Sequence, residues 1–205
     1  MINIGALLKT FIYLISSSLL YPVLFLLVIL VLWIIVYAGS FFAEWVERLK
    51  LNGFSAAEFS DFLRKENNRK IVSYRVSSYL KKLNPLLNGS QFEEIEIENL
   101  LQEDNLKMWK SLDRIRMIIR IGPSLGLIGT LIPMGTGLAA MGQGNMAKLS
   151  SDLVIAFTTT VVGLAVGITA YFFYTVKRRW VEEDIKNMEL ATEILTNNIL
   201  KEKKH

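Results

Sequence analysis

The sequence predicts an all-α membrane protein with three transmembrane helices, two of which continue into the cytoplasm. Three long apolar blocks carry this prediction, at 19–38, 121–143 and 152–176. Apart from Asp152 at the start of the third block, they contain no Asp, Glu, Lys, Arg or His. A helix of about 20 residues, rising about 1.5 Å per residue, covers the hydrocarbon core of a bilayer. Each block is therefore long enough to cross the membrane once.

The distribution of Lys and Arg orients these spans. Of the 23 basic residues, fourteen lie in 39–120, seven lie in 177–205, and the remaining two are Lys9 and Lys148. Segments rich in Lys and Arg stay on the cytoplasmic side of the membrane. We therefore expect a multi-pass inner-membrane protein whose N-terminus and 144–151 loop lie outside and whose C-terminus is cytoplasmic.

Composition argues against several kinds of chemistry. The chain has no cysteine and a single histidine, His205, so we expect no metal site, no cofactor and no enzymatic activity. The net charge of +4 does not indicate nucleic-acid binding, because acidic residues are interleaved with the basic ones and no recognition motif is present. The lipid bilayer is the expected surrounding.

Residues 1–18 are apolar but contain Lys9 and end in three serines. This pattern predicts an interfacial helix that lies on the outer surface before the first span. The alternative is the hydrophobic region of a cleaved signal peptide, which is disfavoured because no small-residue cleavage pattern follows. Beyond the first span, we expect Glu44 to be a solvated charge at the level of the lipid headgroups.

The many Lys and Arg residues and the helical pattern of 39–120 predict a cytoplasmic helical domain. Two helical stretches, roughly 55–83 and 90–120, are separated by the breaker and turn signals Asn84-Pro85 and Asn88-Gly89.

A long helix is predicted to start at Ser90, because Ser90 and Glu93 have the spacing of a capping box. Its helical period runs into the second span without a strong breaker, and the period of the third span runs on into the helical tail at 177–205. Two long helices therefore project from the membrane, and their apolar stripes need partners.

The second and third spans carry small residues at helical spacing, which lets membrane helices approach closely. Four of them are predicted to serve helix packing: Gly126, Gly129, Ala156 and Ala170. Hydroxyls and further glycines lie on or beside the same faces, and five of these residues are candidates for lining a polar pore: Thr130, Thr160, Thr159, Gly163 and Gly167. Two alternatives remain open, since glycines serve packing alone in many membrane helices and threonines bond back to their own helix.

Two strings resemble the signature helices of the MotA/TolQ/ExbB proton channel family: PSLGLIGT at 123–130 and AFTTTVVGL at 156–164. The sequence resemblance extends over about 115–180. The rest of the chain resembles the family only in the order of its spans and loops. Three spans, an external N-terminus and a large first cytoplasmic loop resemble the ExbB and TolQ branch, although the AFTTT string is similar to MotA. The resemblance implies a homopentameric ring whose second and third helices line a pore. A single-span partner similar to ExbD or TolR would occupy this pore, with its transmembrane aspartate near Thr130 and Thr160.

One position departs from the family pattern. Many members have a glutamate early in the third helix where this chain has Ile155. The nearest acid is Asp152, which follows two serines at the start of the third span. A short acid there caps the helix and complements its dipole, or else gives the ion access to the pore.

The spans contain no carboxylate pathway of their own, because ionisable residues inside a membrane are the usual markers of one. A partner must therefore bring the acid. We expect a subunit that conducts an ion, a proton in the simplest case, and couples ion-motive force to mechanical work. The alternative is a non-conducting membrane scaffold that oligomerises and recruits cytoplasmic partners. A substrate transporter is disfavoured, because the spans show no internal repeat.

Overall fold

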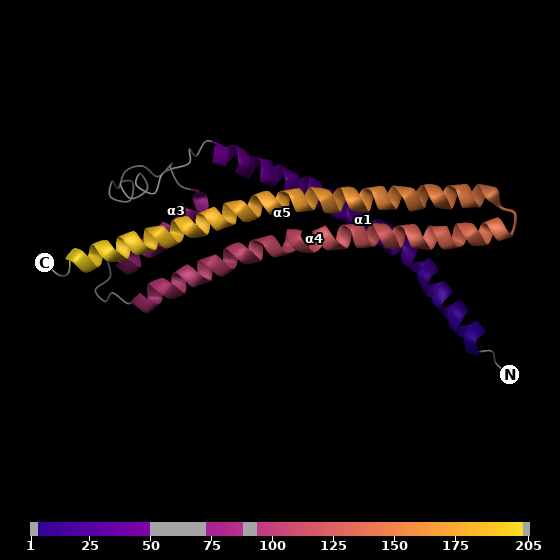
Figure 1. The fold of residues 1–205 in the computed structure, drawn as a ribbon, viewed down its shortest axis with the longest axis horizontal. Helices are drawn as coiled ribbons and strands as arrows, with labels where there is room; N and C mark the ends of the chain where they lie inside the picture. The colour runs from indigo at the N-terminus through magenta and orange to yellow at the C-terminus, as the bar shows by residue number, and fades with distance from the viewer. Residues whose placement is uncertain (1–3, 50–72, 88–93, 203–205) are drawn as a thin grey trace. The chain divides into compact units, whose positions relative to one another are not determined.

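The structure is a computed structural model that describes residues 4–49, 73–87 and 94–202. These residues form four α-helices: α1 (Ile4–Leu49), α3 (Tyr74–Leu87), α4 (Glu94–Gly142) and α5 (Met146–Glu202) (Figure 1). Of these, α1, α4 and α5 each contain a stretch long and apolar enough to cross a membrane. The predicted all-α membrane fold with three transmembrane helices is confirmed.

The chain divides into two compact units, each built from separate stretches of sequence. The first unit combines 1–39 with 114–174, and the second combines 40–113 with 175–205. The boundaries near residues 39 and 174 fall within a few residues of the ends predicted for the first and third spans. Apolar blocks therefore gather in the first unit and the predicted cytoplasmic segments in the second.

In the first unit, α4 and α5 form an antiparallel hairpin with a short connection (Figure 1). The amide of Asn145 donates to the carbonyl of Ala140 and that of Gly144 to Met141, with Gly144 at a φ of 77°. This is the Schellman ending of a helix, which favours glycine at the left-handed position. Asn145 then caps α5, because its side-chain oxygen accepts from the amide of Lys148 at 3.0 Å.

The connection between the two helices is shorter than the 144–151 loop that we predicted. Residues 146–151, which we predicted to belong to this loop, instead form roughly the first two turns of α5. The reason is that two caps meet back to back, so no extended loop is needed between the helices.

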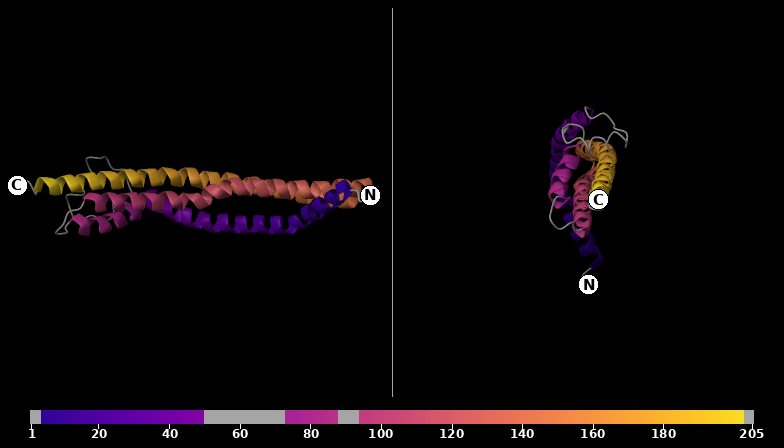
Figure 2. Two further views of the ribbon diagram at one scale, coloured as in Figure 1. Left: turned by 90° about the horizontal axis from the view of Figure 1, so that it is seen from below. Right: turned by 90° about the vertical axis from the view of Figure 1, so that its left-hand side faces the viewer.

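Helix α1 is one unbroken helix from Ile4 to Leu49, with Pro22 inside it (Figure 2). Residues 4–18 therefore do not form a separate helix ahead of the first span. A location of this segment in the membrane interface stays a prediction.

The second unit contains α3, which packs through a stripe at spacings of three and four: Val76, Tyr79, Leu83 and Leu87. Pro85 lies inside this helix, so the break predicted at Asn84-Pro85 is wrong and the helix continues to Leu87. The predicted turn at Asn88-Gly89 and the capping box at Ser90 lie outside the described residues. The helix predicted to run from Ser90 into the second span is continuous in its described part, α4, and the predicted continuity of the third span with the tail is present in α5.

Candidate functional site

The α4–α5 hairpin brings small residues of the two helices into backbone contact. A Cβ atom added at Gly163 would lie 2.7 Å from the carbonyl oxygen of Gly122 and 2.7 Å from the Cα of Gly126. One added at Gly167 would lie 2.6 Å from the Cγ of Pro123. Real Cβ atoms do not approach other atoms this closely, so only glycine permits this helix separation.

Two threonine hydroxyls meet at the edge of this interface. Thr130 on α4 and Thr160 on α5 are in direct hydroxyl-to-hydroxyl contact, and both are half-buried. The Thr130 Oγ1 lies 2.8 Å from the carbonyl oxygen of Gly126, and both hydroxyls lie 3.2 Å from that of Ala156. Each hydroxyl has one proton to donate and accepts through its lone pairs. The pair can therefore exchange its bonds with the backbone for bonds to an added acceptor.

The other candidate pore residues lie deeper in the hairpin. Thr159 is buried, donates to the carbonyl of Ala156 at 2.9 Å and covers Gly129. Gly163 and Gly167 are closed off by α4 of the same chain. Of the four positions assigned to packing, Gly126 and Gly129 face α5, while Ala156 and Ala170 are buried. Within one chain, only Thr130 and Thr160 of the five candidates retain exposed surface, and their lining of a pore stays a prediction.

Asp152 occupies a different place from the one that capping would give it. It lies inside α5, beyond the first turn, and it accepts a hydrogen bond of 2.7 Å from the Thr136 hydroxyl of α4. The capping interpretation is wrong, because α5 begins two turns earlier and Asn145 caps it. Ile155, one turn further along α5, is half-buried.

The second unit contains a charge cluster that joins three helices. Asp184 of α5 is 1% exposed and pairs with Arg48 of α1 and, at 3.6 Å, with Arg75 of α3. Glu44 pairs with Arg75 at 2.8 Å and with Lys177 at 3.6 Å. Our expectation of a solvated Glu44 is therefore wrong, since the side chain is half-buried among three cations.

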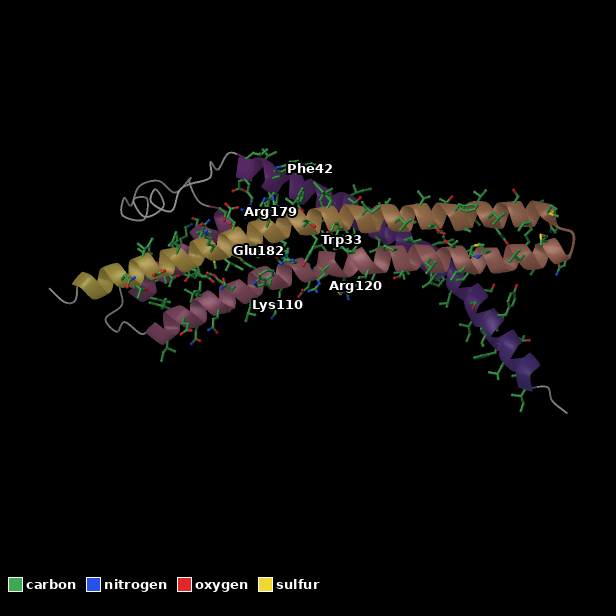
Figure 3. The ribbon with its side chains drawn as sticks, viewed as in Figure 1. Trp33, Phe42, Lys110, Arg120, Arg179 and Glu182 are labelled. Carbon is green, nitrogen blue, oxygen red and sulfur yellow. The ribbon has the colours of Figure 1, made fainter. Side chains whose placement is uncertain are left out.

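Aromatic rings line the same cluster. The Arg48 guanidinium lies 5.1 Å from the centroid of the Trp180 ring, which stacks on Phe41 at 5.2 Å. Lys110, by contrast, is exposed and lies on the side of α4 that faces away from α5 (Figure 3). The cluster thus ties α1, α3 and α5 together, as buried charges require partners.

Further along the second unit, Tyr79 of α3 meets Thr192 of α5, with 2.6 Å between their oxygens. Burial raises the pKa of the Tyr79 hydroxyl above its ordinary value of 10.0, because the charged phenolate would be desolvated. Tyr79 is therefore neutral at physiological pH and serves as a hydrogen-bonding core residue.

Sequence reasoning missed Thr136 and Asp184. A signal for Thr136 does exist, because contacting residues of the hairpin lie at nearly equal distances from the turn at Gln143–Asn145. This holds for Gly126 with Gly163, for Thr130 with Thr160 and for Thr136 with Asp152. Locating the turn correctly would therefore have paired Asp152 with Thr136. No comparable signal exists for Asp184, because its partners come from distant parts of the sequence.

The fold and site define a multi-pass helical membrane protein built on a glycine-packed, hydroxyl-bearing hairpin. The described residues contain no cluster of three or more His, Cys, Asp or Glu that could hold a metal ion. The model of the MotA/TolQ/ExbB proton channel family matches residues 62–190, which is more than half of the chain. The chain belongs to this family.

A relative from Methanothermobacter thermautotrophicus, named "Putative biopolymer transport protein ExbB homolog", is 31% identical over 104 residues. The matched stretch covers 50% of this chain and 37% of the relative. This likeness supports the ExbB-like character of the chain.

Proposed function

We propose that this chain is the ExbB/TolQ-like subunit of an inner-membrane complex that conducts an ion, a proton in the simplest case. The complex couples ion-motive force to mechanical work through a single-span partner similar to ExbD or TolR. The observation that carries the proposal is the Thr130–Thr160 hydroxyl pair at the edge of the hairpin. Family membership supports it, and the chain performs no covalent chemistry in this role.

The hydroxyl pair suits a partner carboxylate. An aspartate on a neighbouring helix is costly in hydrocarbon unless donors or a proton compensate its charge. Thr130 and Thr160 are half-buried, and each can turn its single proton from a backbone carbonyl toward such an oxygen. When the aspartate is protonated, the same hydroxyls accept from it. The pair thus solvates both states of the acid, and ion-motive force can drive the change between them.

The proposed assembly is a homopentamer with the N-terminus outside and the C-terminus in the cytoplasm. The hairpin uses its glycines within one chain, so contacts between chains fall to its exposed faces. Labelling of single introduced cysteines in intact cells tests the orientation. Modification of a cysteine at Lys81 by an impermeant reagent would contradict it, and native mass spectrometry tests the pentamer.

The test of the proposed function is the double variant Thr130→Val/Thr160→Val. Valine keeps the volume and removes the hydroxyl, so a partner acid loses its donors at a cost of about 1–3 kcal/mol, roughly 5–150-fold in ion flux. Thr158→Val is the matched control, because Thr158 is exposed on another face of α5 and bonds back to the Val154 carbonyl at 2.7 Å.

Ion flux is measured in vesicles that contain both components, beside the yield of assembled oligomer. We expect flux to fall in the double variant while assembly and the control stay intact. Full flux in the double variant would contradict the pore assignment. Loss of flux and assembly together would favour the alternative, a non-conducting scaffold in which these hydroxyls serve packing.

A further inference from the structure

We propose that Asp152 and Thr136 form a binding site for a monovalent cation, H⁺ or Na⁺, in the part of the hairpin next to its turn. The inference rests on the proposed function only in that the bound cation is the ion to be conducted. The site itself belongs to this chain and requires no partner.

The geometry gathers oxygen atoms at one point between α4 and α5. The Thr136 Oγ1 lies 2.7 Å from the Oδ2 of Asp152 and 3.1 Å from the carbonyl oxygen of Pro133. A hydroxyl has one proton, so Thr136 donates to one of these oxygens and keeps lone pairs for a cation. Carboxylate, hydroxyl and carbonyl oxygens are the ligands that hard cations prefer. A proton needs only the carboxylate.

In the described structure, Asp152 neither caps a helix nor forms an ion pair. Asn145, and not Asp152, caps α5. No described Lys or Arg has its nitrogen within 4.0 Å of the carboxylate, and Lys148, one turn earlier on α5, is exposed. The part of α4 packed on Asp152, around Gly137, carries no ionisable group. Asp152 is half-buried, so its carboxylate is a ligand that a cation can approach.

A cavity in the same unit gives water a route to Thr136. Its volume is about 250 Å³, and Thr136 of α4 lines it with Tyr13, Ser16 and Ser17 of α1 and with the apolar residues Leu131, Ile132 and Gly135. A water occupies roughly 30 Å³ of liquid, so several waters fit. Water can therefore reach Thr136, which lies next to the Asp152 carboxylate, through this cavity.

Carbodiimide labelling of the purified full chain tests the site without a partner. Dicyclohexylcarbodiimide adds to a protonated carboxyl in apolar surroundings, and trypsin releases Asp152 in the peptide 149–177, where the adduct is found by mass. We expect an adduct at Asp152, and occupation of the site by a cation should prevent it. Asp152→Asn is the control, because it keeps an acceptor for Thr136 and cannot react.

Sodium distinguishes the two cations. Replacing choline by Na⁺ at constant ionic strength is expected to block the adduct if the site binds Na⁺, and to leave it unchanged if the site takes only a proton. Thr136→Val should raise the yield several-fold, because the carboxyl group loses the hydroxyl that holds it between the helices, and Thr136→Ser should return the yield to that of the wild type.

The absence of an adduct at Asp152 would overturn the site. Equal yields in the wild type and Thr136→Val would overturn the role of the hydroxyl. A chain that is labelled as expected yet supports no flux with its partner would leave the site standing and contradict the proposed function instead.

Discussion

Gly163→Ala is expected to push α4 and α5 apart. The new Cβ would lie 2.7 Å from the carbonyl oxygen of Gly122 and from the Cα of Gly126, and both are backbone atoms. A rotamer change cannot relieve either contact, so a helix must move. Non-bonded carbon contacts are favourable at about 3.5–4.0 Å, so the required displacement is about 0.8 Å or more.

The magnitude follows from two opposing terms. Overpacking of this kind costs about 1–3 kcal/mol, and the greater helix propensity of alanine returns up to about 1 kcal/mol. Gly135→Ala on α4 is the matched control, because nothing lies within 4 Å of a Cβ added there. Gly135→Ala gains the same helix propensity, and its new Cβ displaces no neighbouring atom. The two variants should therefore differ by about 1–3 kcal/mol, roughly 5–150-fold in the folding equilibrium.

Unfolding of the purified chain in mixed micelles of increasing SDS content measures this difference. We expect Gly163→Ala to unfold at a lower SDS fraction than the wild type and Gly135→Ala to unfold at the same or a higher one. Equal unfolding midpoints for the two alanine variants would show that the hairpin tolerates separation, and would refute the argument from backbone contact.

Three further changes test other parts of the structure, each followed by the free energy of unfolding. Asp184→Ala should cost about 3–5 kcal/mol, because two half-buried arginines lose their buried carboxylate partner, whereas Glu182→Ala, in an exposed pair, should cost under about 0.5 kcal/mol. Gly144→Ala should cost about 1–2 kcal/mol, because its φ is positive. Burial raises the pKa of Tyr79, so its contribution is complete below pH 10.0 and is lost as pH rises through the raised value. Tyr79→Phe should remove that alkaline loss, and an identical pH profile in both proteins would contradict it.

The part of the fold that depends on local sequence was predictable. Apolar blocks without charges predicted the three spans, and unbroken helical periods predicted the long helices α4 and α5. Both signals depend on residues that are near neighbours in sequence. The spacing of Gly126 and Gly129 gave the packing face of α4 for the same reason. Their partners on α5 follow only after the turn has been located.

Two errors concern acidic residues, and they have different origins. The turn ends at Asn145, earlier than we predicted. Asp152 therefore lies within α5, where it contacts α4, and does not cap the helix. Glu44 was expected in solvent because its own helix gave it no partner, whereas its partners come from α3 and α5. Contacts between helices distant in sequence leave no periodic trace, so a single sequence does not reveal them.

The equal distances of paired residues from the turn restrict how the length of this chain can change during evolution. One residue inserted in α4 between Thr136 and the turn would rotate the faces that carry Gly126, Thr130 and Thr136 by about 100° relative to the cap of Asn145. Every pair from Gly126–Gly163 to Thr136–Asp152 would then lose its register at once. Insertions and deletions are therefore expected to accumulate beyond Gly122 and Gly167, in the segments farther from the turn, while the stretch between these two glycines keeps its residue count.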